Sequence, residues 1–152
     1  MRIIGHRGAK GLAPENTAES FQKALACNVD EIEFDVRVTK DGVPVIIHDA
    51  KIKAHGATIA IREQTYSELL EICPSLLTLN EALLQLKNSK QLLIEIKPGE
   101  PLEPVLAAVT TAITSGQEES LFSFASFDLT ILLALRAAMP NAELVVNERW
   151  SG

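Results

Sequence analysis

Apolar and polar residues along this chain follow two different periods, and the two periods take turns. Six runs rich in β-branched or aromatic residues predict strands over 2–6, 31–39, 43–50, 91–97, 121–126 and 142–148. The segments between them place apolar residues three or four positions apart and predict helices over 14–28, 77–88, 101–116 and 127–140. Strands that alternate with helices are typical of an α/β fold with a mainly parallel sheet.

Cap residues support two of the predicted helices. Asn16 or Thr17 can cap the helix that follows Pro14. Thr78 and Glu81 have the spacing of a capping box at the start of the next one.

Residues 50–77 interrupt the alternation. This segment holds a weak apolar run at 58–61 and a short helical pattern at 65–72, so we expect an inserted loop region over one end of the sheet. No linker or repeat divides the rest, and residues 1–152 are expected to form a single domain.

The strand over 31–39 carries apolar residues on one face and charged residues on the other. The apolar set is Ile32, Phe34, Val36 and Val38, and the charged set is Glu31, Glu33, Asp35 and Arg37. A solvated face would explain this pattern on an antiparallel edge strand. In a parallel sheet, helices cover the outer face, so we expect the charged set to face the interior or mouth of a barrel. The strand over 91–97 repeats the pattern with Glu95 and Lys97.

Histidines follow two of the predicted strands. The first strand ends in the sequence GHRG, where His6 and Arg7 stand between glycines that we expect to clear space for an anionic ligand. The third strand ends on His48 and Asp49. His55 lies in the irregular segment and is expected to be solvated.

Ligands bind at the carboxyl ends of parallel strands. Seven side chains are expected to meet at such ends: His6, Arg7, Glu33, Asp35, His48, Glu95 and Lys97. Three carboxylates suit Mg²⁺ or Ca²⁺, and two imidazoles can divide the tasks of acid and base. An arginine and a lysine can hold phosphate oxygens. The set predicts metal-assisted cleavage of a phosphodiester.

Overall composition excludes other classes of ligand. Hydrophobic residues make up 47% of the 152 residues and charged residues 22%, which is typical of a globular domain. The longest apolar runs are interrupted by charge and are shorter than the roughly 20 residues of a membrane span. The net charge is −6 and no basic run appears, so we expect neither nucleic-acid binding nor membrane insertion.

The two cysteines and the start of the chain indicate a compartment. Cys27 and Cys73 lie in dissimilar surroundings without metal-binding spacing, and are expected to be buried free thiols. No leader-like segment precedes the first predicted strand, so a cytoplasmic location is expected.

The motifs GHRG, APENT, EFDVRVTKDGVPVIIHD and IEIK resemble those of the glycerophosphodiester phosphodiesterase family, whose members are TIM barrels. The resemblance is dense over 2–49, resumes in LTLNEALL and LLIEIKP, and is weaker in FSFASFD. It implies an acid/base pair, His6 and His48, and three metal ligands, Glu33, Asp35 and Glu95. It also implies phosphate contacts from Arg7 and Lys97, with Asn16 and Asp49 in supporting positions.

The same resemblance implies a reaction. One histidine deprotonates the glycerol 2-hydroxyl for attack on phosphorus while the other protonates the departing alkoxide, and water then opens the cyclic phosphate. The products are glycerol phosphate and an alcohol. A phosphoinositide or a lysophospholipid is a further substrate class, against which the lack of a basic or aromatic membrane-facing stretch speaks.

The chain departs from the family pattern in two places. A complete barrel of this type takes at least about 200 residues, and only six of eight strands are predicted here. Three explanations of the missing strands are open: the sequence is a fragment of a longer protein, a natural short form, or a chain whose barrel a second copy completes. If the chain is folded and soluble, completion by a second copy is our hypothesis. A catalytically silent barrel that acts as a binding or assembly module is the alternative function. After His48, KIKAHGAT replaces a more usual arginine-threonine-threonine run.

Overall fold

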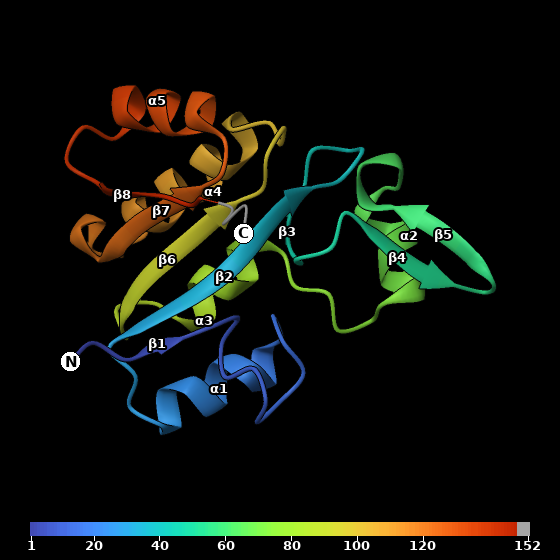
Figure 1. The fold of residues 1–152 in the computed structure, drawn as a ribbon, viewed down its shortest axis with the longest axis horizontal. Helices are drawn as coiled ribbons and strands as arrows, with labels where there is room; N and C mark the ends of the chain where they lie inside the picture. The colour runs from blue at the N-terminus through green and yellow to red at the C-terminus, as the bar shows by residue number, and fades with distance from the viewer. Residues whose placement is uncertain (149–152) are drawn as a thin grey trace.

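A computed structural model describes residues 1–148, in which strands and helices alternate along most of the chain (Figure 1). The main sheet follows the order β1-β2-β6-β7-β8, and β3 pairs with β2 off this path. Its strands are β1 (Ile4–Gly5), β2 (Glu31–Val38), β3 (Pro44–Ile46), β6 (Gln91–Ile96), β7 (Phe122–Ser126) and β8 (Glu143–Val146). Every pairing along the path is parallel, which confirms the α/β fold with a mainly parallel sheet.

Four helices accompany the parallel strands at the predicted places. They are α1 (Ala18–Ala26), α3 (Leu79–Gln85), α4 (Glu103–Thr114) and α5 (Leu129–Ala138). The side chain of Thr17 accepts a hydrogen bond from the backbone of Ser20, so Thr17 is the cap of α1 and Asn16 is free for another task. Thr78 and Glu81 form the predicted capping box of α3.

The inserted region forms a small structure of its own at one side of the sheet, away from β7 and β8 (Figure 1). It holds the antiparallel hairpin of β4 (Lys51–Ala54) and β5 (Ala57–Ala60), followed by α2 (Tyr66–Ile72). Its buried core consists of Val45, Ile61, Leu69 and Leu76. The short helix was predicted, but neither strand of the hairpin was, because KIKA carries little apolar pattern and the apolar run at 58–61 is weak. His55 lies in the hairpin turn and is exposed as predicted.

The direction of β3 differs from the one that we expected for the strand before His48. We expected His48 at the carboxyl end of a parallel strand, but β3 runs antiparallel to β2, with Val36 opposite Ile46. The turn between the two strands is too short for a parallel crossover, which needs a dozen or more residues. The chain after β3 therefore comes back along β2, and the backbone N–H of Ile47 donates to the carbonyl of Asp35 over 3.0 Å.

The main hydrophobic core lies between the sheet and its helices. The side chains of Ile32, Phe34 and Ile94 point to this outer side of β2 and β6, and each is fully buried. The rings of Phe21 on α1 and Phe34 lie 5.5 Å apart between centroids, at 54° to each other. The apolar face of β2 therefore packs against helices, as its alternation predicted.

The two ends of the strand order are open within residues 1–148. β1 and β8 each pair with one neighbour only, and β1 has just two residues. Apolar side chains are exposed beside both, including Ile3, Ile4 and Val146. The expected open edges are therefore present, and the described sheet does not close into a barrel.

The two cysteines are less buried than we expected. Cys27 and Cys73 are both free thiols, but Cys27 is exposed and Cys73 half-buried, so the prediction that they are buried was wrong. Cys27 is the C-cap residue of α1 and lies at the end of that helix.

Within the described part of the chain, the helices are too short or too polar to cross a membrane.

Candidate active site

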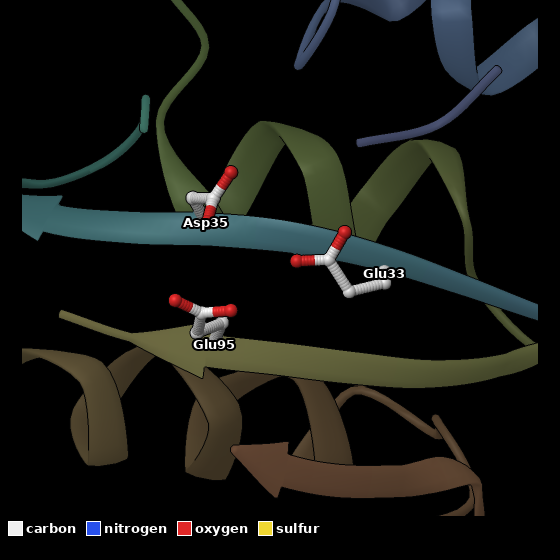
Figure 2. Close-up of side chains that lie close together, drawn as sticks. All are labelled: Glu33, Asp35 and Glu95. Atoms are coloured by element: carbon white, nitrogen blue, oxygen red, sulfur yellow. The ribbon is translucent and has the colours of Figure 1, made fainter. Parts of the chain in front are cut away.

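Three carboxylates from adjacent strands meet on the inner face of the sheet, opposite the main core (Figure 2). Glu33 and Asp35 stand two positions apart on β2, and Glu95 on β6 is the direct neighbour of Asp35 in the parallel register. One oxygen from each lies within 4.8 Å of the others. Glu33 is 6% exposed and Asp35 only 1%. This acidic trio is the predicted metal-ligand set, and the structure brings it together.

Cations and amides surround the acidic trio. The Nζ of Lys97 lies 2.6 Å from Asp35 Oδ1 and also contacts Glu95. Arg7 Nε lies 3.2 Å from Asp35 Oδ2, to which Asn16 Nδ2 also donates over 3.0 Å. Each carboxylate that the fold withdraws from water therefore has a polar partner, as the burial of charge requires.

The electrostatic states of Glu33 and Asp35 diverge. Burial, reinforced by the negative charges of Asp35 and Glu95, raises the pKa of Glu33 to about 7, although the backbone N–H of Arg7 donates to it. Burial also acts to raise the pKa of Asp35, but hydrogen bonds from Lys97 and Asn16 outweigh it and the pKa is lowered. A divalent cation bound there would offset the burial and the repulsion that raise the pKa of Glu33, and would favour its ionised form. Three oxygen donors of this kind fit Mg²⁺ or Ca²⁺.

The loop after β1 carries His6 and Arg7 to the acidic trio. Arg7 has a left-handed φ of 50°, and its backbone N–H donates to Glu33 Oε2 over 2.8 Å. His6 Nε2 lies 3.8 Å from the same oxygen, and 60% of the His6 side chain is exposed. Burial and the positive charge of Arg7 lower the pKa of His6, which favours the neutral imidazole near pH 7.

The glycines of this loop serve packing within the chain, contrary to the expectation that they clear space for an anion. A Cβ on Gly8 would lie 2.3 Å from Ser20 Oγ, and Gly8 has a φ of 85°. Ser20 Oγ accepts from the backbone N–H of Ala9 over 2.7 Å and donates to the carbonyl of Arg7 over 2.8 Å. The first turn of α1 therefore holds the loop that presents His6 and Arg7.

His48 stands somewhat apart from this group. Its Nδ1 lies 2.7 Å from Asp49 Oδ1, which leaves Nε2 as the ring nitrogen available to a ligand. The hydrogen bond with His48 lowers the pKa of Asp49, so the carboxylate stays ionised. Within residues 1–148, the His48 side chain makes no hydrogen bond or ion pair with the acidic trio. A hollow of about 420 Å³ opens beside it, between the start of α1 and the inserted region.

Three residues that the sequence analysis left without a role also contact the site. Arg37 Nε donates to the carbonyl of His48 over 2.8 Å, and its NH1 lies 3.0 Å from Glu100 Oε1. Asn147, just after β8, donates from Nδ2 to Glu95 Oε2 over 3.1 Å. The alternation on β2 had placed Arg37 on the charged face. Glu100 and Asn147 lie in loops where no pattern of that kind exists.

The comparisons with known proteins agree on one family. The family model described as the glycerophosphoryl diester phosphodiesterase family matches residues 6–149. A glycerophosphodiester phosphodiesterase of Bacillus altitudinis is 44% identical over 69 residues, which are 45% of this chain and 28% of that protein. Human glycerophosphodiester phosphodiesterase domain-containing protein 5 is 31% identical over 147 residues, 97% of this chain and 22% of that protein.

Solved structures give the same result. An Oleispira antarctica phosphodiesterase, solved in complex with the product sn-glycerol-3-phosphate, matches with a TM-score of 0.81 and 28% identity. The match covers 95% of this chain and 64% of that one. A glycerophosphodiester phosphodiesterase from Thermotoga maritima matches with a TM-score of 0.76 and 30% identity, covering 100% of this chain and 66% of that one. The chain thus spans under two thirds of these structures and smaller shares of the curated relatives.

Proposed function

The chain belongs to the glycerophosphoryl diester phosphodiesterase family, and on that premise we propose that it hydrolyses glycerophosphodiesters to glycerol phosphate and an alcohol. The observation that carries this proposal is the convergence of Glu33, Asp35 and Glu95 within 4.8 Å, beside Arg7 and Lys97. Carboxylates are buried together at a cost in folding free energy, and such clusters concentrate at functional sites.

In this proposal the acidic trio holds one divalent cation, Mg²⁺ or Ca²⁺. The bound cation would stabilise the negative charge that develops on a phosphate oxygen and on the attacking hydroxyl. Arg7 and Lys97 contribute positive charge beside the trio and would bind the remaining phosphate oxygens, Arg7 as a planar fork and Lys97 as a point charge.

The two histidines would move the protons. His6, largely exposed and close to Glu33, and His48, with Asp49 on its Nδ1, each keep a ring nitrogen for the substrate. One would take the proton of the glycerol 2-hydroxyl as it attacks phosphorus. The other would give a proton to the oxygen of the departing alcohol, and the roles reverse when water opens the cyclic phosphate.

A second candidate function is a silent barrel that acts as a binding or assembly module. Within residues 1–148, β1 and β8 each lack a neighbour on one side, and this favours the module because their backbone groups can pair with a second copy of the chain. The free thiols Cys27 and Cys73 support the cytoplasm as the location for either function. Residues 1–152 act as one domain in both.

The test is release of glycerol phosphate from glycerophosphocholine by the purified chain. We expect EDTA to abolish turnover, and His6→Asn to lower kcat by about 10² to 10⁴-fold, the usual loss when a general acid or base is removed. His55→Asn is the matched control, since His55 is exposed in the hairpin turn and is not among the residues assigned to the site. Turnover that neither EDTA nor His6→Asn alters would overturn the site assignment. No turnover together with intact metal binding would favour the silent module.

A further inference from the structure

A second hollow, of about 380 Å³, lies at the rim of the site and is lined by basic side chains. It forms where the end of β2, the loop after β6 and the inserted region meet. Its charged lining residues are Arg37, Lys40, Arg62 and Glu100. Neither the acidic trio nor His6 or His48 lines this hollow.

The charge of the hollow is positive although the chain as a whole is acidic, with a net charge of −6. Glu100 is neutralised, because its carboxylate accepts from Arg37 NH1 and from the backbone N–H of Val38, each over 3.0 Å. Lys40 and Arg62 are exposed, and within residues 1–148 neither side chain has an ion pair or hydrogen bond. The nearby Asp41 is held by Thr39 and by the backbone of Tyr66.

The hollow adjoins the proposed reaction site through one side chain. Arg37 follows Asp35 by two positions on the same face of β2, which places their Cα atoms about 7 Å apart along the strand. Arg37 also donates to the carbonyl of His48, and only 15% of its side chain is exposed. A substrate whose reacting phosphate lies at the acidic trio would therefore extend its alcohol past Arg37 toward Lys40 and Arg62.

We propose that this hollow binds a second phosphate, carried as a phosphomonoester on the alcohol part of the substrate. The inference rests on the proposed function and specifies its substrate class: glycerophosphodiesters of phosphorylated alcohols, such as a phosphorylated polyol. Arg37, whose charge Glu100 balances and whose Nε donates to the His48 carbonyl, supplies only its remaining N–H groups, which these two contacts hold in place. Lys40 and Arg62 supply positive charge that no ion pair or hydrogen bond engages within residues 1–148, although Lys40 is close enough to Glu68 to lower the pKa of that carboxyl.

Binding without turnover tests the hollow alone. In EDTA, we expect inositol 1,4-bisphosphate to bind the chain about five- to tenfold more tightly than it binds Lys40→Met/Arg62→Met, as two exposed charge pairs would give. Lys51→Met/Lys53→Met removes the same charge from the inserted hairpin and is the matched control. Equal affinity for both double variants would overturn the proposal.

Turnover tests the substrate class. We expect the ratio of kcat/KM for glycerophosphoinositol 4-phosphate to that for glycerophosphoinositol to fall about five- to tenfold in Lys40→Met/Arg62→Met, and to stay unchanged in the Lys51/Lys53 control. A chain that turns over neither diester but binds the bisphosphate through the hollow would refute the proposed function and leave the hollow standing as an anion site. A hollow-dependent signal with phosphatidylinositol 4-phosphate vesicles, and none with the soluble bisphosphate, would overturn the assignment to a soluble substrate.

Discussion

The two faces of the β2–β6 pair are both largely withdrawn from water but differ in composition, because the outer face is apolar and the inner face carries the acidic trio beside Leu93. On the outer face, Ile32, Phe34 and Ile94 are fully buried among other apolar side chains. On the inner face, Glu33 and Asp35 are 6% and 1% exposed, yet they are charged residues packed beside one another. Burial alone therefore says little about what a residue does, whereas burial combined with charge separates the stabilising face from the chemical one.

The difference is one of free energy. Apolar burial on the outer face stabilises the fold, at about 25 cal/mol for each Å² removed from water. On the inner face, withdrawal of carboxylates from water opposes folding and is only offset by Lys97, Arg7 and Asn16. A chain selected for stability alone would place apolar residues there, so the acidic trio points to chemistry.

The largest effect that separates the two faces is expected from adjacent leucines on β6. Leu92 faces the outer core and is fully buried, while Leu93 faces inward and is half-buried. We expect Leu92→Ala to lower the free energy of unfolding by about 3 to 4 kcal/mol, and Leu93→Ala by about half of that or less. Urea unfolding of both variants measures the two losses. Equal losses would show that the faces do not differ in packing.

The next effect concerns Glu33 and pH in the metal-free chain. Its pKa is raised to about 7 in the folded protein, so below its ordinary value of 4.5 the carboxyl is neutral in both states and carries no penalty. As pH rises from that value through about 7, the unfolded chain loses the proton first, and stability falls. We expect Glu33→Gln to stabilise the EDTA-treated chain by about 1 to 3 kcal/mol near pH 8, and to change little near pH 4.

Denaturant midpoints across this pH range measure that effect, and Glu71→Gln on the exposed side of α2 is its control. The lowered pKa of Asp35 affects stability in a different pH range. Its ionised carboxylate contributes to the free energy of unfolding above pH 3.8, its ordinary pKa, and that contribution is lost as the pH falls below this value. A Glu33→Gln variant that is less stable than the wild type near pH 8 would contradict the account of the inner face.

The smallest of the three effects is expected at Asn16, which donates to Asp35 and has a left-handed φ of 58°. Asn16→Gly keeps that backbone conformation accessible and removes only the amide, whereas Asn16→Ala adds about 1 kcal/mol of backbone strain. We expect both to weaken Mn²⁺ binding about tenfold, as residues that orient metal ligands do, and only Asn16→Ala to lose further stability. Calorimetric titration gives the affinity, and wild-type affinity in Asn16→Gly would show that the contact does not orient Asp35.

The sequence was informative where side-chain alternation decides the face of a strand. Period-two alternation placed Glu33, Asp35 and Glu95 on one side, and parallel pairing then brings neighbouring strands into contact. Residues in loops gave no such signal. Asn147 follows β8 and contacts Glu95 of β6 across the intervening strand β7. That contact depends on the tertiary fold, and no local sequence pattern indicates it.

Two errors have identifiable physical reasons. The short turn between β2 and β3 allows only an antiparallel return, so the direction of β3 could have been predicted from connection length. The role of Gly8 could not, because its close neighbour Ser20 comes from α1 and the angle at which a helix crosses a loop is not encoded locally. The strand-end pattern singled out the seven site candidates, and the likeness to known motifs added the expected supporting position of Asn16.

The edge strands β1 and β8 affect the tendency of the protein to associate in concentrated solution. In the described residues 1–148, β1 and β8 present backbone donors and acceptors beside exposed Ile3, Ile4 and Val146, and such edges favour strand pairing between molecules. At neutral pH, mutual repulsion between chains of net charge −6 holds these edges apart. Acidification toward the isoelectric point near 5.1 cancels that repulsion, so precipitation on mild acidification is a colloidal consequence of the architecture.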